Sequence, residues 1–248
     1  MFRFHPRQKR FTPDPKPAQL STEKKGEIKS QGISTAQKSL DDGIRANRQQ
    51  KYGEAESRLQ PAYDCFKDTN DTLGWYNAAF FRGINCMALK RYQEAETYLA
   101  EAETLARELK HSSHIAMSTF RHGVNLKYLG RNDEAISKLE TAAHQAFEIS
   151  SQALDISKDK AIFKETEGVA YFHLGELYHF QGQEQKSFAC FEKSSLSLSS
   201  GTPESKTSQK YLNALDVIQE SSKKRPAPMT EDEENEARSP KRPRRSST

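Results

Sequence analysis

One glycine- and alanine-marked segment recurs at even spacing along this chain, and the recurrence restricts its fold more than any other feature. Copies begin at the equally spaced glycines Gly43, Gly83 and Gly123. In every copy an alanine follows the glycine by 12 residues, a leucine by 16 and a second alanine by 19. The first of these alanines are Ala55, Ala95 and Ala135. A fourth, weaker copy begins at Gly175 after a 12-residue insertion, and repeats of this length indicate stacked supersecondary units.

The small residues of the repeat predict pairs of helices that pack closely. A glycine in the first helix lets the second helix approach, and a small residue in the second helix receives it. Glycine costs about 1 kcal/mol of helix propensity relative to alanine, so its recurrence needs a packing reason. Short polar turns at 50–52, 90–92 and 130–132 join the two helices and predict antiparallel pairs.

The pattern of apolar residues extends these pairs into an all-helical chain. The insertion lengthens helices, because residues 143–167 contain neither glycine nor proline. A last amphipathic helix over 204–221 starts after Pro203 and caps the stack. The other helices are expected at 34–49, 52–68, 72–89, 92–110, 113–129, 132–157, 160–181 and 183–198.

Charge and proline divide the chain into a folded middle and two tails. The net charge is +4, of which residues 1–32 contribute +5 and residues 223–248 contribute +3, leaving −4 for the middle. Eight of the ten prolines lie before residue 18 or after residue 225. Such tails bury too little apolar surface to fold alone. We therefore expect disordered basic tails at 1–32 and 223–248 and a repeat domain at 33–222.

The order of glycine, alanine, apolar residue and alanine resembles the tetratricopeptide repeat, over residues 36 to about 195. The spacing of about 40 residues exceeds the family's usual 34, and the first helices lack an early aromatic residue. This longer spacing is similar to the repeats of kinesin light chains and of spindle-orientation or cohesin-loading adaptors. The resemblance implies a right-handed α-solenoid of antiparallel helix pairs. It also implies protein partners, bound as an extended peptide or a helix on the concave face.

The family's groove positions, carried onto this sequence, predict a partner-binding face on the first helices. Its apolar column contains Leu40, Phe80, Phe120 and Phe172, with Ile44, Ile84 and Val124 one turn later. Phe81 belongs to the predicted face as well, and beside the column stand Arg48, Arg121, Lys127 and His173. The alternative interpretation is that longer helices turn these residues into the core between repeats.

One binding mode of the family can be compared with the sequence directly. Chaperone-binding members hold a C-terminal carboxylate through lysine, asparagine and other basic side chains. Only one of the matching positions here carries a suitable residue, Arg121; the others are Leu40, Ile44, Phe81 and Met117. We therefore expect an apolar or mixed peptide ligand instead of a carboxylate clamp.

Little in the sequence points to catalysis, a cofactor or a metal. The near histidine pairs, His111/His114 and His173/His179, have no third ligand at a convincing spacing. No phosphate-binding glycine loop or hydrolase motif occurs. Three scattered cysteines predict buried thiols and not a disulfide framework. No apolar run is long enough to span a membrane. Because no catalytic motif is present, we expect that the chain is not an enzyme.

The C-terminal tail predicts a nuclear address. Lys241, Arg242, Arg244 and Arg245 form a short basic import signal, and an import receptor is the partner it implies. A second cluster consists of Lys223, Lys224 and Arg225. Ser239 precedes Pro240 and a basic pair, which is typical of sites phosphorylated by proline-directed kinases. Thr12-Pro13 and Thr202-Pro203 are weaker candidates.

These features favour a nuclear adaptor that acts in chromatin or cell-cycle assemblies. Shuttling between the nucleus and the cytoplasm is an alternative to a purely nuclear location. The second interpretation is a cytoskeletal or motor-type cargo adaptor. A third is a nucleic-acid-associated factor, because Phe2, Phe4 and Phe11 lie among basic residues of the N-terminal tail. Direct contact with nucleic acid is the least favoured of the three, since the body of the chain is acidic.

Overall fold

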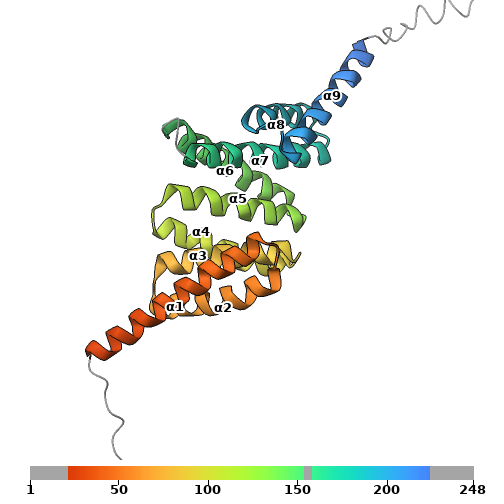
Figure 1. Ribbon diagram of the computed structural model, residues 1–248. Coiled ribbons are helices and arrows are strands. Elements are labelled where there is room, and N and C mark those ends of the chain that lie inside the picture. The colour runs from red at the N-terminus through yellow and green to blue at the C-terminus, as the bar shows by residue number, and fades with distance from the viewer. Residues whose placement is uncertain (1–21, 154–157, 224–248) are drawn as a thin grey trace, which may run out of the picture. The chain divides into compact units, whose positions relative to one another are not determined.

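A computed structural model describes residues 22–153 and 158–223 of the chain. These residues form helices joined by short turns, and they contain no strand. The predicted all-α class is therefore confirmed. In chain order (Figure 1) the helices are α1 (Thr22–Arg48), α2 (Tyr52–Thr69), α3 (Thr72–Ala88), α4 (Tyr92–Glu108), α5 (Ser112–Tyr128), α6 (Asn132–Gln152), α7 (Lys158–Phe180), α8 (Glu184–Ser197) and α9 (Pro203–Lys223).

The chain divides into two compact units, residues 1–129 and 130–248, and we call them unit 1 and unit 2. Unit 1 holds α1–α5, and each of these helices packs on the next. The backbones of α1 and α3, and of α3 and α5, also approach within 8 Å, whereas no such approach joins α2 and α4. The first helices of the pairs therefore lie on the inner side of unit 1.

The repeat glycines Gly43 and Gly83 of unit 1 each lie directly under the leucine of their own copy. A methyl group on Gly43 would be 2.8 Å from Leu59, and one on Gly83 would be 2.7 Å from Leu99. Both leucines are fully buried. The close approach of the two helices therefore depends on the missing side chain, as the repeat predicted.

The turns that follow α1, α3 and α7 share one pattern. A residue with positive φ follows the helix: Gln50 and Lys90 in unit 1 and Gly182 in unit 2. The next N–H then donates to the carbonyl five residues back, as from Arg91 to Cys86 at 2.8 Å. This hydrogen bond reverses the chain within three residues and sets the second helix antiparallel to the first.

Buried asparagines join successive repeats in unit 1, two residues after the repeat glycine. Asn85 donates through Nδ2 to the carbonyl of Tyr52, at 3.2 Å, and accepts from Asn47 at 3.1 Å. Asn125 donates to the carbonyl of Tyr92 at 2.9 Å. Both asparagines are buried, so each repeat is held to the start of the preceding second helix by a polar contact as well as by apolar packing.

Unit 2 contains α6–α9 and absorbs the insertion by lengthening helices. Helices α6 and α7 have 21 and 23 residues, against 17 in each of α3–α5. A methyl group on Gly175 would lie 2.7 Å from Phe191, which repeats the arrangement of unit 1. Ser187 takes the place of the repeat alanine, and its hydroxyl donates to the Gly175 carbonyl at 2.9 Å. The fourth copy therefore pairs its helices in the same way.

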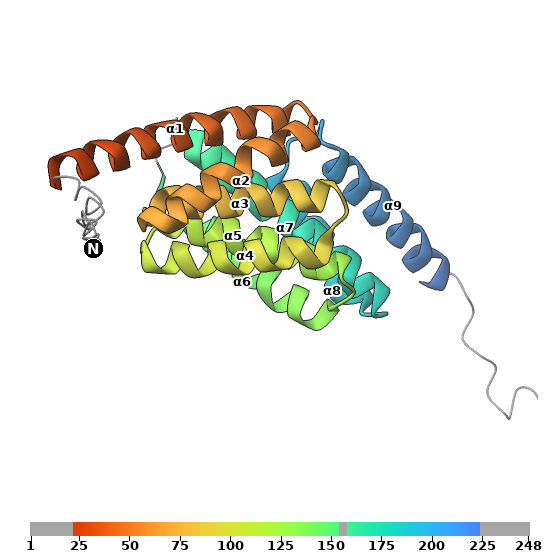
Figure 2. The same cartoon turned by 90° about the horizontal axis from the view of Figure 1, so that it is seen from below.

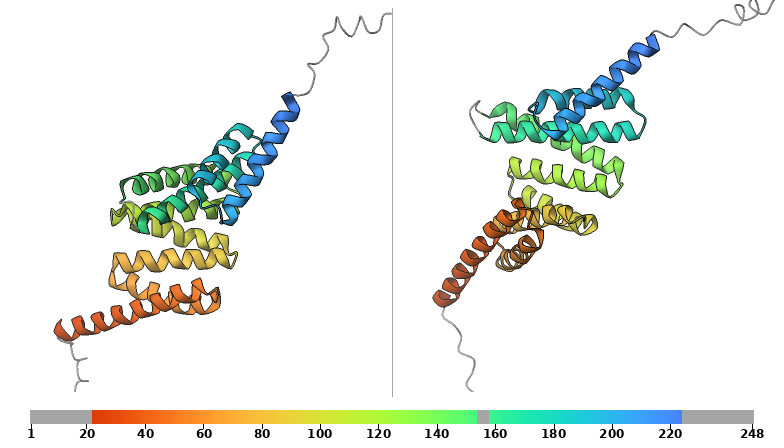
Figure 3. Two further views of the ribbon diagram at one scale, coloured as in Figure 1. Left: turned by 45° about the horizontal axis from the view of Figure 1, so that its top comes forward. Right: turned by 45° about the vertical axis from the view of Figure 1, so that its right-hand side comes forward.

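Helix α9 packs on α8 and touches α7, in the position expected of a cap. Leu212 is buried, and Ser208 donates to the hydroxyl of Ser194 at 3.1 Å. The ring of Tyr211 stacks on Phe191 with centroids 4.6 Å apart. The far half of α9 extends past α8 (Figure 3), which agrees with its length of 21 residues. The bond between Ser208 and Ser194 therefore holds the cap on α8, together with the apolar contacts of Tyr211 and Leu212.

Two predicted helix boundaries differ from the structure by more than two residues. Helix α1 begins at Thr22, so residues 22–32 are helical and not part of a disordered tail; in Figure 2 this end of α1 runs past α2. Extending an existing helix costs far less than starting one, so residues 22–32 need no core of their own. Helix α6 ends at Gln152 instead of residue 157.

The helix approach in unit 1 can be tested with Gly83→Ala. Its methyl group would meet Leu99, which cannot swing away because it is fully buried. We expect the free energy of unfolding to fall by about 1–3 kcal/mol. The control is Gly53→Ala in α2, where the methyl group meets nothing within 4 Å. That change adds helix propensity and raises the free energy of unfolding by up to about 1 kcal/mol. Urea denaturation measures both, and equal stability of the two variants would contradict the packing role of Gly83.

Candidate partner-binding face

Within residues 22–153 and 158–223 no group of three or more histidine, cysteine, aspartate or glutamate side chains is placed to hold a metal ion. Nor does that part of the chain contain a helix long and apolar enough to cross a membrane. The candidate site is the inner side of the first helices, where the sequence predicted a binding face.

The predicted apolar column does not line a groove. Leu40 and Phe80 belong to the core of unit 1, and Phe172 belongs to the core of unit 2, where it packs on Phe191. The reason is geometric: side chains three residues before the repeat glycine point between neighbouring helices. Four of the predicted contact residues are therefore core residues, with exposed fractions of 1% for Leu40, 6% for Phe80, 4% for Phe120 and 9% for Phe172. Val124, one residue after its glycine, is also buried, with an exposed fraction of 5%.

Three other predicted apolar residues form a half-exposed strip on the inner side of unit 1. They are Ile44 of α1 and Phe81 and Ile84 of α3, and each packs against the core with one side. Met117 of α5 is half-buried in the same way. We call these four residues the apolar strip. The strip leaves apolar surface available to a partner without removing anything from the core.

The predicted polar residues surround the strip only in part. Arg48 is exposed near the end of α1, and Arg121 and Lys127 of α5 are half-buried. The guanidinium carbon of Arg121 lies 5.3 Å from the centre of the Phe120 ring. His173 belongs to unit 2, where its Nδ1 lies 3.0 Å from Glu176 Oε2. The predicted cationic residues of unit 1 therefore belong to the same helices, α1 and α5, as Ile44 and Met117 of the strip.

A ladder of aromatic rings supports Phe81 from behind. Its ring meets that of Phe80 edge-on, with centroids 5.4 Å apart, and Phe80 stacks on Tyr76 at 5.8 Å. Tyr76 stacks in turn on His114 at 4.3 Å, and His114 on His111 at 4.1 Å. Burial raises the pKa of the Tyr76 hydroxyl, so Tyr76 stays neutral. The ladder holds Phe81 in one position relative to α5.

Two buried polar clusters of unit 1 were not expected from the sequence. The guanidinium carbon of Arg82 lies 4.1 Å from the ring centre of Tyr98 and 5.0 Å from that of Tyr63. His122 Nδ1 lies 2.9 Å from Glu103 Oε2. All of these but Tyr98 are buried, so we interpret the clusters as contacts that stabilise the helix stack, and not as sites open to a ligand.

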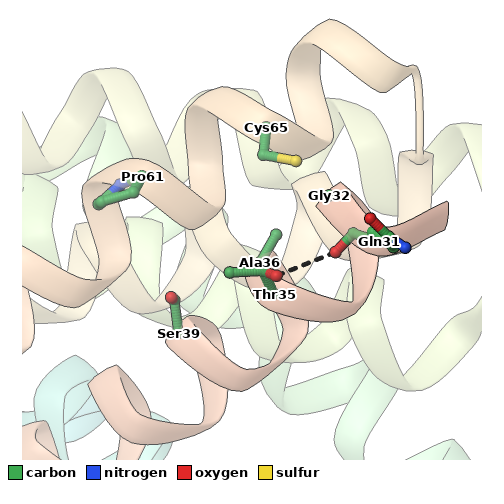
Figure 4. A pocket seen from close by; sticks show the side chains of 7 residues that line it. All are labelled: Gln31, Gly32, Thr35, Ala36, Ser39, Pro61 and Cys65. Atoms are coloured by element: carbon green, nitrogen blue, oxygen red, sulfur yellow. Dashed lines mark hydrogen bonds between the residues drawn. The ribbon is translucent and has the colours of Figure 1, made fainter. Parts of the chain in front are cut away.

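A separate pocket of about 440 Å³ opens between α1 and α2. Figure 4 shows its lining: Gln31, Gly32, Thr35, Ala36, Ser39, Pro61 and Cys65. The Thr35 hydroxyl donates to the carbonyl of Gln31 at 2.9 Å, within the same helix. Small side chains without converging polar groups give the pocket no chemistry that would select a ligand.

Residues 169–195 match the family model of the tetratricopeptide repeat. The matched segment covers most of α8 and the second half of α7, including Gly175 and Phe191. The predicted family resemblance is therefore confirmed, and the matched segment is the copy with the weakest repeat pattern. Helical repeats of this kind build extended surfaces that bind other proteins, so protein binding is the general role indicated.

Two solved structures share a weak overall likeness with the chain. One is BtubC (BKLC) from P. vanneervenii, with 11% identity and a TM-score of 0.45, covering 89% of this chain and 96% of that one. The other is the apo form of the quorum sensor NprR from B. thuringiensis, with 14% identity and a TM-score of 0.36, covering 80% of this chain and 64% of that one. No curated protein sequence matches this chain.

The aromatic ladder makes stability depend on pH. Burial lowers the pKa of His114 below 6.5, and the neighbouring His111 lowers it further. The unfolded chain therefore binds more protons as pH falls through that value, so the free energy of unfolding decreases. We expect His114→Gln to show a smaller decrease between pH 7 and pH 5. Urea denaturation at both pH values measures it, and an equal decrease in both proteins would exclude His114 as a source.

Proposed function

We propose that this chain is a non-catalytic nuclear adaptor that holds an extended segment of a partner protein on the inner side of unit 1. The observation that carries the proposal is the apolar strip of Ile44, Phe81, Ile84 and Met117, which is half-exposed on three neighbouring first helices. A row of this kind matches a peptide that places apolar side chains on several helices at once. Buried aromatic side chains behind it keep the row rigid.

Several features restrict the ligand. The strip is apolar at positions where a carboxylate clamp would need lysine or asparagine, so recognition rests on apolar contact. Asn47 is half-exposed next to the strip, and its amide oxygen is available to a peptide backbone because Nδ2 is used on Asn85. Arg48 adds a positive charge at one end. An apolar or mixed peptide, bound through side chains and backbone, fits this surface best.

The nuclear part of the proposal depends on the C-terminal tail. Lys223 is the last residue of α9, and the other import-signal residues lie outside the described residues: Lys224, Arg225, Lys241, Arg242, Arg244 and Arg245. Ser239 lies there as well. Clustered basic side chains next to proline suit the acidic groove of an import receptor. A chromatin or cell-cycle assembly is the setting that such an address favours.

Phe81→Gln tests the binding face. This change removes a half-exposed ring from the strip and leaves the buried Phe80 in place, so the helices are expected to stay folded. We expect partners captured by the wild-type chain from nuclear extract to be lost or reduced at least about tenfold, as for a central contact residue. Quantitative mass spectrometry of the captured proteins measures the loss, and circular dichroism checks folding.

The matched control is Phe147→Gln. Phe147 is 55% exposed on α6, a second helix of unit 2, so its loss removes the same kind of ring from a different surface. Partners should survive this change. For a partner obtained in this way, amide hydrogen exchange should slow in α1, α3 and α5. If folded Phe81→Gln retains every partner, the inner side of unit 1 is not the binding face.

The nuclear address can be tested by exchanging Lys241 and Arg242 for alanine in a chain fused to tandem fluorescent proteins, which prevent free diffusion. We expect the fusion to move from the nucleus to the cytoplasm, because two charges that pair with the receptor are lost. The same exchange at Lys9 and Arg10 is the control and should leave localisation unchanged. Nuclear fluorescence of the Lys241/Arg242 variant would contradict the assignment.

Ser239→Asp in the same fusion should weaken import, because it adds negative charge beside the cluster.

A further inference from the structure

The connection from α8 to α9 contains the dipeptide Thr202-Pro203, which the proposed adaptor function does not use. Ser199, Ser200, Gly201 and Pro203 are exposed there, and Thr202 is half-exposed. Over the described ranges, 22–153 and 158–223, no other serine or threonine precedes a proline. An acceptor hydroxyl on an exposed connection is what a proline-directed protein kinase requires.

Local hydrogen bonds hold this connection in place. Oγ1 of Thr202 accepts a hydrogen bond from the N–H of Ser205, at 3.1 Å, and donates to the carbonyl of Ser199, at 3.3 Å. The N–H of Thr202 donates to the same carbonyl at 3.1 Å, and the carbonyl of Thr202 accepts from the N–H of Lys206 at 3.1 Å. These bonds join residues at most four apart, and the residues on either side of Thr202 are exposed, so a local opening is enough to present Oγ1 to an enzyme.

A cleft beside Thr202 provides room for a larger group than a hydroxyl. It measures about 330 Å³ and lies between the end of α8 and the start of α7. Lys164 and Glu165 of α7 line it together with Thr202. Glu204 in the first turn of α9 is a second nearby acid. Lys164 and Glu165 thus line the cleft, and Glu204 and Lys206 lie at the start of α9.

We propose that Thr202 is a phosphorylation site and that its phosphate fastens α9 to the rest of unit 2. A proline-directed kinase supplies the γ-phosphoryl group of ATP. The bond from phosphorus to Oγ1 of Thr202 forms as the bond to the β-phosphate oxygen breaks, ADP leaves, and the hydroxyl proton passes to the base of the kinase. The product carries about two negative charges at the start of α9.

The phosphate strengthens contacts that Thr202 already makes. Its oxygens replace the neutral acceptor of the Ser205 N–H, and a charge-assisted bond of this kind is about twice as strong as a neutral one. Lys164 faces the same cleft and attracts the charge. The bond from Oγ1 to Ser199 is lost, and Glu165 and Glu204 oppose the phosphate. Glu165 is exposed and Glu204 is half-exposed, so water and salt screen their repulsion of the phosphate, and the charge-assisted bond to the backbone outweighs it.

The test uses the full chain with a purified proline-directed kinase and ATP, and a Thr-Pro peptide in the same tube reports kinase activity. Mass spectrometry maps the phosphate, and hydrogen exchange follows residues 203–214. We expect phosphate on Thr202 and exchange in this part of α9 roughly three- to tenfold slower, while α3 and α4 are unchanged. Pro203→Ala is the matched control, because it retains the Thr202 hydroxyl and removes the proline. It should receive no phosphate at Thr202.

Each result decides the proposal. Phosphate on the reference peptide but not on Thr202 would overturn the assignment of the site. Phosphate on Thr202 with unchanged or faster exchange in α9 would overturn its role in fastening the helix. Partner capture through the inner side of unit 1 is a separate readout, so failure here leaves the proposed adaptor function untouched.

Discussion

The close approach of two helices over a glycine is the constraint on which the rest of the structure depends. Gly83 lets Leu99 lie against the backbone of α3, and Gly43 and Gly175 serve Leu59 and Phe191 in the same way. This approach fixes how each first helix is rotated relative to its second helix. Once that rotation is set, helical geometry determines which side chains lie in the core, in the strip or on the solvent-exposed surface.

The position of the strip illustrates this dependence. Residues three before the glycine, such as Leu40 and Phe80, point between helices and are buried. One residue after the glycine, Ile44 and Ile84 keep one side open, whereas Val124 at the same place in the next copy is buried. Phe81 lies beside its buried neighbour Phe80 and is held edge-on against it. A partner that contacts the strip therefore meets residues whose positions the core has already determined. Binding to such a prearranged surface loses little conformational entropy.

Much of the fold was predictable because it is local and repeated. Helix boundaries in α2 to α5 agree with the expected ranges within two residues, since the positive-φ turn at Lys90 and its equivalents falls where the polar turns were seen. Asn85 was missed, although Asn125 occupies the same place in the next copy. Its hydrogen bond reaches a carbonyl 33 residues away in the sequence. A polar residue within a helical pattern is expected to be exposed unless its bonding partner is known, and sequence spacing does not reveal so distant a partner.

The sequence by itself determined that this chain folds as repeated antiparallel helix pairs, because glycine, alanine and leucine at fixed spacing suit close helix packing and little else. It also determined that the tails are basic and rich in proline. Only the tertiary structure decided which apolar residues are available to a partner. Phe80 and Phe81 are neighbours of the same type, and one is core while the other is half-exposed. Exposure depends on the rotation of packed helices, a property of contacts between distant segments that helical periodicity cannot supply.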